Sequence, residues 1–114
     1  GLATNNSEDK IMSVANFSIG QIVQHRLFNY RGIVIDVDYK FLGTDDWYQQ
    51  SAQSRPPKDR PWYLVLVDNS IHQTYVAERN LEISEDISSI HHPMLDHYFI
   101  VMENGKYQLR TRKN

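Results

Sequence analysis

The stretch Trp62-Tyr63-Leu64-Val65-Leu66-Val67 is the most hydrophobic run of the chain and predicts a central β-strand. The turn-forming residues Asp68-Asn69-Ser70 follow it, and residues 72–77 are predicted to return as a partner strand. Another turn at 78–80 leads to residues 81–83, which predict a short closing strand. The hydrophobic stretch is therefore expected at the centre of an antiparallel arrangement.

The segment upstream predicts a β-hairpin. Residues 17–25 alternate between apolar and polar side chains around Gly20, which indicates a turn leading into a half-buried strand. Asn29 and Gly32 supply turn chemistry, and residues 33–38 form a β-branched run that favours a second strand. Five short strands at this spacing predict a mainly β fold, as a small antiparallel barrel or sandwich.

A long connection interrupts this pattern between residues 39 and 60. Helix-capping residues precede a polar and aromatic segment, so one or two helical turns are predicted over residues 44–50. Residues 54–61 contain three prolines, which remove backbone donors and exclude regular structure. A long Pro-rich loop in a compact domain is often a binding loop.

The C-terminal part predicts a loop, a short helix and a second hairpin. Residues 84–90 are polar, and Pro93 suits the first position of a short helix over residues 94–97. Residues 99–109 carry Asn104-Gly105, the signature of a two-residue type I′ hairpin turn. Whether this hairpin joins the main sheet is left open by the sequence.

Length and composition predict one β domain (17–98) between a flexible leader (1–16) and a C-terminal hairpin with a basic tail (99–114). Gly1 is not a natural initiator, and the sequence is equally compatible with Met12 as a native start or as a tail residue.

The 114 residues contain no cysteine, which excludes disulfides and thiolate chemistry. No apolar run could span a bilayer and no signal-peptide pattern is visible, so a cytoplasmic protein is expected.

Two sets of polar residues were considered as catalytic or metal sites. Asp36 and Asp38 share one face of a predicted strand, and Asp45-Asp46 follows, but no pocket is indicated that could raise the pKa of a carboxyl group. His92 and Asp96 stand four residues apart beside His91 and His97, yet adjacent histidines point to different faces. Solvated carboxylates and a solvated histidine linker are favoured. His25 and His72 are isolated, and we expect them to be packing or hydrogen-bonding residues and not a catalytic pair. We expect no metal, no cofactor and no enzymatic activity.

Local charge and aromatic residues point instead to binding. The net charge is −2, from 12 basic and 14 acidic residues, which does not favour nucleic acid but permits a local basic face. Arginines beside aromatic rings can hold phosphates and bases, and both residue types are enriched at protein interfaces. The candidate partner-binding residues in and around the loop are Trp47, Tyr48, Arg55, Lys58, Arg60 and Trp62. A sheet edge could also bind another protein or a second copy of the chain.

Four segments in order resemble the HspQ family, also called YccV-like or hemimethylated-DNA-binding. They are Phe17-x-Ile19-Gly20-Gln21-x-Val23-x-His25-Arg26, Tyr30-Arg31-Gly32-Ile33-Val34-x-Asp36-Val37-Asp38, Pro61-Trp62-Tyr63 and Thr74-Tyr75-Val76-Ala77-Glu78-x-Asn80-Leu81. The resemblance covers residues 17 to 95 and leaves out the hairpin from Phe99 to Leu109. It departs at Leu64, where family members often carry histidine.

This resemblance implies an SH3-like β-barrel and a role in the stress response. Members are described as heat-induced, as binding hemimethylated DNA and as modulating protein degradation by the Lon protease. We therefore expect a binding protein whose partners are Lon and its substrates, with hemimethylated DNA as the alternative partner. Because the net charge is mildly acidic, the resemblance combined with composition favours the protein partner.

Overall fold

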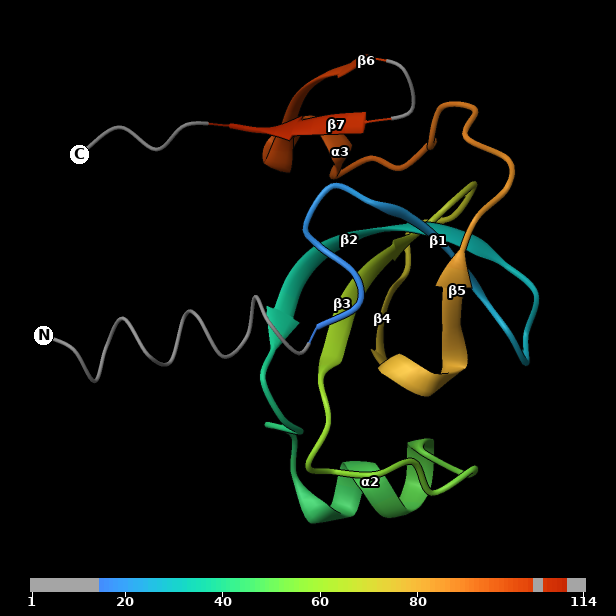
Figure 1. Cartoon of the computed structure of the whole chain (residues 1–114), viewed down its shortest axis with the longest axis vertical. Helices are drawn as coiled ribbons and strands as arrows, with labels where there is room; N and C mark the ends of the chain where they lie inside the picture. Colours follow the sequence, from blue (N-terminus) through green and yellow to red (C-terminus); the bar gives the residue numbers. More distant parts are fainter. Residues whose placement is uncertain (1–14, 104–105, 111–114) are drawn as a thin grey trace, which may run out of the picture.

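The computed structural model describes residues 15–103 and 106–110, and the side chains of 101–103 and 106 are not part of that description. Its main feature is a five-stranded antiparallel sheet with strand order β4-β3-β2-β1-β5 (Figure 1). The strands are β1 Ile22–His25, β2 Arg31–Asp38, β3 Trp62–Val67, β4 Gln73–Ala77 and β5 Leu81–Ile83. A 3-10 helix, η1 (Glu78–Asn80), joins β4 to β5. The predicted mainly β, antiparallel fold is confirmed.

The central strand β3 pairs with β2 on one side and β4 on the other, as its hydrophobicity predicted. Its side chains alternate between two cores because successive residues of a strand face opposite sides of the sheet. Tyr63 and Val65 enter the inner core, while Trp62 and Leu66 pack on the outer face. The buried inner core comprises Phe17, Val23, Val34, Tyr63, Val65, Val76 and Leu81.

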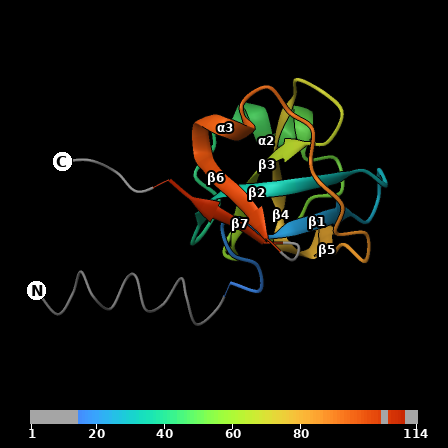
Figure 2. The same ribbon diagram turned by 90° about the horizontal axis from the view of Figure 1, so that it is seen from above.

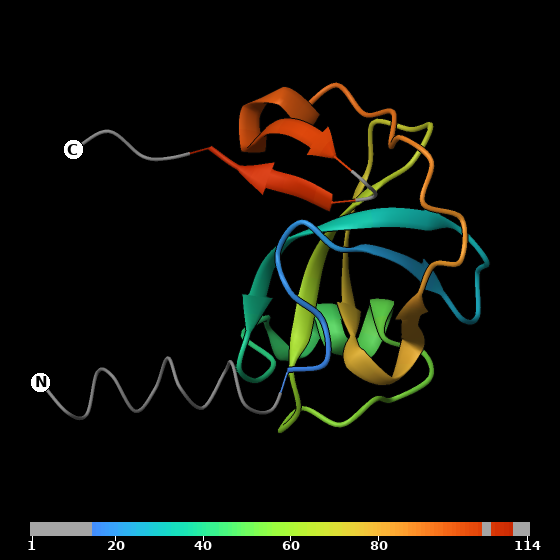
Figure 3. The same ribbon diagram turned by 45° about the horizontal axis from the view of Figure 1, so that its top comes forward.

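The predicted C-terminal hairpin is present as a separate two-stranded sheet of β6 (Phe99–Glu103) and β7 (Lys106–Leu109). It crosses the outer face of the main sheet near β2 (Figures 2 and 3). Phe99 and Ile90 are buried there against Ile33 and Leu66. The hairpin therefore covers one half of the outer face. The predicted Asn104-Gly105 turn lies outside the described residues.

Helix α2 (Asp45–Ser51) covers the other half of the outer face, at the opposite end of the sheet from the hairpin (Figure 1). The Thr44 hydroxyl accepts from the Trp47 amide at 3.1 Å, so Thr44 is the N-cap and is one of the capping residues expected ahead of this segment. Tyr48 and Ala52 are buried against Trp62. Neither helix of the described chain has the length and apolar composition needed to cross a bilayer.

Helix α3 (Leu95–Tyr98) begins later than the sequence predicted. Pro93 was expected as its first residue, but Met94 is the N-cap, so Pro93 precedes the helix. The reason is a local turn: the Met94 amide donates to His92 Nδ1 at 3.0 Å and the Leu95 amide to the His92 carbonyl at 3.1 Å. These bonds hold the residues before Leu95 out of the helix.

Gly32 was assigned to a turn from its type, and that prediction was wrong, because it lies inside β2 opposite Val67. The turn is formed by the preceding residues, where Asn29 adopts φ +58°. A Cβ atom at Gly32 would lie 2.4 Å from Val65 Cγ1 and 2.6 Å from the Leu66 carbonyl oxygen. Glycine is therefore required for close approach to β3 rather than for turn geometry.

Candidate functional site: a groove along the edge of β4

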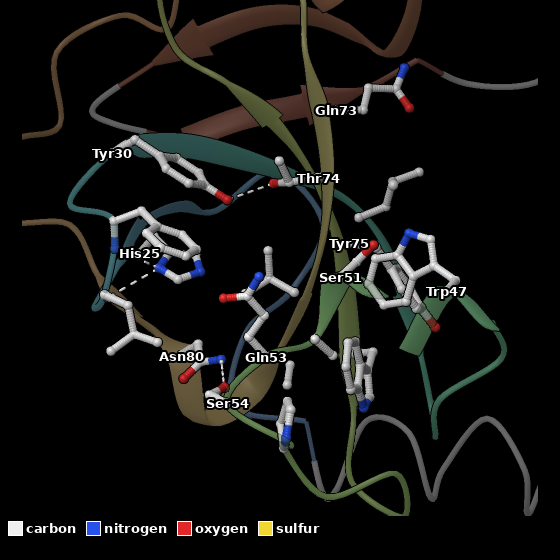
Figure 4. A pocket seen from close by; sticks show the side chains of 18 residues that line it. His25, Tyr30, Trp47, Ser51, Gln53, Ser54, Gln73, Thr74, Tyr75 and Asn80 are labelled. Carbon is white, nitrogen blue, oxygen red and sulfur yellow. Dashed lines mark hydrogen bonds between the residues drawn. The ribbon is translucent and has the colours of Figure 1, made fainter. Parts of the chain in front are cut away.

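A cavity of about 1020 Å³ lies beside β4 (Figure 4). All five residues of β4, Gln73–Ala77, line it. Thr74 and Val76 belong to the inner face of this strand, whereas Tyr75 and Ala77 belong to the outer face. Because side chains of both faces contribute, the cavity follows the edge of the strand. It is a groove with one wall on each side of the sheet.

The first wall comes from the turn between β1 and β2. The His25 ring is 5% exposed and stacks on Phe28, with 4.7 Å between ring centroids. His25 Nδ1 accepts from the amides of Leu27 and Phe28, each at 3.1 Å, so this imidazole shapes the turn. The Tyr30 hydroxyl bonds to the Thr74 hydroxyl at 2.7 Å and ties the wall to β4. Phe28 itself is 74% exposed.

The second wall comes from α2 and the loop after it, and its main feature is a group of packed aromatic rings. Trp47 packs against Tyr75 at 5.7 Å and against Trp62 at 6.1 Å between ring centroids. The Tyr75 hydroxyl donates to Asp38 Oδ2 at 2.6 Å and accepts from the Leu42 amide at 3.1 Å. Burial and this bond to Asp38 raise the pKa of Tyr75 above its usual range. The Tyr75 hydroxyl group is therefore uncharged, and its two hydrogen bonds hold the side chain in place.

The chemistry of the groove is aromatic and uncharged. No aspartate, glutamate, lysine or arginine is among the described residues that line it. The polar groups are hydroxyls, amides and the His25 imidazole. Their residues are His25, Tyr30, Ser51, Gln53, Ser54, Gln73, Thr74, Tyr75 and Asn80. Such a surface suits a ligand with apolar side chains and hydrogen-bonding groups but no net charge.

Of the six predicted binding residues, the two tryptophans line the groove. Trp47 is half-buried in the second wall, whereas Trp62 is only 1% exposed and donates from Nε1 to the Pro57 carbonyl at 3.1 Å. Trp62 therefore supports the wall from beneath. Tyr48 is also buried, and its hydroxyl donates to the Pro56 carbonyl at 2.7 Å. The Pro-rich loop is thus fastened to the outer core.

The predicted basic residues mostly hold the loop to α2. Arg55 donates to the carbonyls of Tyr48 and Ala52 at 3.1 and 2.8 Å, which satisfies the C-terminal end of the helix. Lys58 Nζ lies 3.2 Å from Asp45 Oδ1 and 4.3 Å from the centre of the Tyr48 ring. Arg60 is exposed. Two of the three cations are therefore already bound within the protein.

None of the residues of the two polar sets considered as catalytic or metal sites lines the groove, although Asp38 accepts from the Tyr75 hydroxyl of its second wall. Asp36 accepts from the Val37 amide at 3.0 Å, and partial desolvation of its carboxyl group raises its pKa. His92 is engaged with the His72 carbonyl through Nε2 at 3.0 Å. Across residues 15–103 and 106–110, no group of three or more histidine or acidic side chains is arranged to hold a metal ion.

The stability of the folded protein is expected to fall as the pH drops below about 6.5, because of His25. Burial lowers the pKa of His25, so the unfolded chain takes up a proton at a higher pH than the folded chain. The contribution of the neutral His25 ring to stability is therefore fully present above the pKa that His25 has in the unfolded chain. It is lost as the pH falls below that value, by up to about 1.4 kcal/mol per pH unit. Thermal unfolding between pH 5.5 and 8 measures this. The control is His25→Asn, which does not titrate in this range and whose Oδ1 can replace Nδ1 as acceptor, but which loses the ring stacked on Phe28 at all pH values. Its stability should therefore change less than that of the wild type between pH 8 and pH 5.5.

Sequence reasoning missed the first wall of the groove. His25 was expected to be a packing or hydrogen-bonding residue, which its two bonds from backbone amides confirm, but no groove was predicted beside it. No role was assigned to Leu27 and Phe28 in the turn before β2. The available signal was the pair of large apolar side chains in that turn, since turns usually carry small polar residues. The two residues are 58% and 74% exposed, which is a larger apolar surface than a turn requires.

A comparison with protein families matches residues 15–106 to the family described as hemimethylated DNA-binding protein YccV like. The matched range contains the whole five-stranded sheet, both walls of the groove and β6. It extends past residue 95, where the resemblance read from the sequence ended. The hairpin excluded from that resemblance is therefore largely within the family match.

Proposed function

Since the chain belongs to the YccV-like family of hemimethylated DNA-binding proteins, we propose that it acts by binding other macromolecules and not by catalysis, and that its principal ligands are polypeptides. The observation that carries this proposal is the aromatic groove beside β4, which has no charged residue among its described lining. Duplex DNA presents a dense line of phosphates that requires cations. Polypeptides offer uncharged, apolar segments that suit the groove.

The proposed biological role is modulation of protein degradation by the Lon protease, in particular of denatured or selected substrates. Denatured proteins expose extended apolar segments that are buried when they are folded, and these match the chemistry of the groove. The resemblance to HspQ supports Lon as the protease. The protein would then connect exposed segments of a substrate with the degradation machinery.

Degradation rates of several Lon substrates, measured with and without this protein, test the role. We expect the rate for denatured substrates to change and to depend on the concentration of the protein, with a smaller effect on tightly folded substrates. An unrelated acidic protein of similar size serves as the control. Unchanged rates for every substrate would contradict the proposal.

Binding of hemimethylated DNA is the second candidate function, favoured by the description of the matched family. A titration with methylated, hemimethylated and unmethylated duplexes over a series of salt concentrations tests it. A DNA-binding protein should bind more weakly as salt rises, with a slope that reports the number of phosphate contacts. No measurable binding at ~50 mM salt would exclude this function.

A further inference from the structure

We propose that the groove binds an extended, uncharged peptide segment that pairs with β4 as an additional strand, and that a carbonyl group of this segment accepts a hydrogen bond from His25 Nε2. This inference rests on the proposed function, in that it takes the ligand to be a polypeptide. It adds the conformation of the ligand, its charge and the residue that orients it.

The first support is the position of β4 in the sheet. In the strand order β4-β3-β2-β1-β5, β4 is at an edge and pairs with β3 alone among the described strands. The outer edge of a strand presents backbone N–H and C=O groups that can pair with an added strand. Because the groove follows β4 over its whole length, a peptide in the groove would lie next to these groups.

The second support is a hydrogen-bond donor of the first wall that faces the groove. Nδ1 of His25 accepts from two backbone amides, so the proton of the neutral ring is on Nε2. His25 is 5% exposed, and its second ring nitrogen points into the groove, towards which the side chain of Gln53 also extends (Figure 4). The hydrogen bonds of the His25 ring to the described chain are both made through Nδ1, which leaves Nε2 to the groove. No buried side-chain nitrogen or oxygen of the described residues lacks a hydrogen-bond partner, so Nε2 is reached by solvent in the groove. A ligand carbonyl would replace water as its acceptor.

The third support is the pair of walls and their lack of charge. Side chains of an added strand alternate in direction, so one set would face the wall of His25 and Phe28 and the other set would face Trp47. A lysine or glutamate placed in the groove would lose hydration without meeting an opposite charge. The structure therefore favours segments with aromatic, aliphatic or hydroxyl side chains at consecutive positions.

Fluorescence anisotropy with defined peptides tests the binding mode. The probe is a fluorescein-labelled, nine-residue peptide with capped ends that alternates valine or tyrosine with threonine. Two further probes carry N-methyl groups on either the odd or the even amides, which removes the donors along one edge of the strand only. We expect one methylated peptide to lose binding at least tenfold and the other to bind like the parent. Equal binding of both methylated peptides would overturn the strand-addition mode, as would failure of the parent peptide to bind.

A second set of measurements uses protein variants. Phe28→Ala removes an exposed ring from the groove and should weaken binding of the parent peptide at least tenfold. Ile71→Ala is the matched control, because Ile71 is 76% exposed, similar to Phe28, and does not line the groove. His25→Asn keeps an acceptor for the turn but has no donor at the Nε2 position, and should weaken binding about fivefold. Equal affinity of Phe28→Ala and Ile71→Ala would contradict the assigned groove.

The outcomes separate this inference from the role in degradation. Peptide binding that is weakened by Phe28→Ala, with unchanged Lon rates, supports the groove and rejects the Lon role. If Lon rates are altered by both the wild type and Phe28→Ala and no peptide binds, peptide binding in the groove is rejected and the Lon role is retained.

A peptide containing lysine and glutamate at its central positions should bind at least tenfold more weakly than the parent peptide. Equal affinity of the two peptides would refute the proposed preference for uncharged segments.

Discussion

Gly32→Ala is expected to destabilise the protein by about 3 kcal/mol or more, which is a large part of the stability of a domain of this size. The added Cβ would lie 2.6 Å from the Leu66 carbonyl oxygen and 2.4 Å from Val65 Cγ1. The carbonyl belongs to the backbone of β3, so no side-chain rotation relieves the contact. Either β2 and β3 separate locally or the inner core shifts, and both changes disturb the centre of the sheet.

Chemical denaturation monitored by tryptophan fluorescence measures this loss. Gly43→Ala is the matched control, because its added Cβ would meet only the far end of the Phe41 ring, at 2.6 Å. A shift of this side chain through χ1 relieves the contact without moving the backbone, so a smaller loss of stability is expected. If Gly32→Ala unfolds at the same denaturant concentration as the wild type, the interpretation of Gly32 as a close-approach residue is wrong.

The sequence predicted the order of the secondary structure because the relevant signals are local. Alternation of apolar residues, β-branched runs and the capping residue Thr44 act within one strand or one helical turn. The five strands, α2 and the C-terminal hairpin were all predicted on this basis and are observed. The errors occurred where a residue type has two uses: Gly32 serves a close packing contact, and Pro93 precedes α3 instead of opening it.

The groove could not be predicted because it joins segments that are distant in the sequence. Tyr30 and Thr74 meet across it although 44 positions separate them, and Trp47 approaches from a third segment. The aromatic residues of the loop were correctly singled out, but their exposure depends on packing that a linear pattern does not contain. Trp47 reaches the groove, whereas Trp62 is buried beneath it. The role of His25 follows only from bonds that its ring makes in three dimensions.

Arg31 joins three parts of the molecule that the sequence did not connect. Its guanidinium group donates to Asp68 Oδ2 at 2.9 Å, and the side chains of Arg31 and Asp68 are only 14% and 9% exposed. The same group donates to the carbonyls of Asp86, Ser88 and Ser89 at 2.8, 2.9 and 3.3 Å. These acceptors belong to the segment between β5 and α3, so Arg31 fastens that segment to β2.

Arg31→Met is expected to lower the free energy of unfolding by about 3 kcal/mol. Methionine keeps much of the volume but leaves the carboxylate of Asp68 poorly solvated and without its cation. The segment before Ile90 would lose its bonds to β2, so amide hydrogen exchange should increase across residues 84–91 and in the hairpin that follows. Chemical denaturation and hydrogen exchange measure the two effects.

Arg26→Ala is the matched control for Arg31→Met, because it removes an arginine whose ion pair is weak. Arg26 lies 3.7 Å from Glu82, and the two side chains are 55% and 47% exposed. Exposed pairs of this kind contribute about 0–1 kcal/mol, so Arg26→Ala should cost much less than Arg31→Met. Arg26 also donates to one carbonyl, that of Leu81, at 3.1 Å. The difference between the two variants therefore reports the burial of the Arg31 pair and the larger number of carbonyl contacts of Arg31. If both variants lose the same stability, or if exchange at 84–91 is unchanged in Arg31→Met, Arg31 does not hold the C-terminal segment on the sheet.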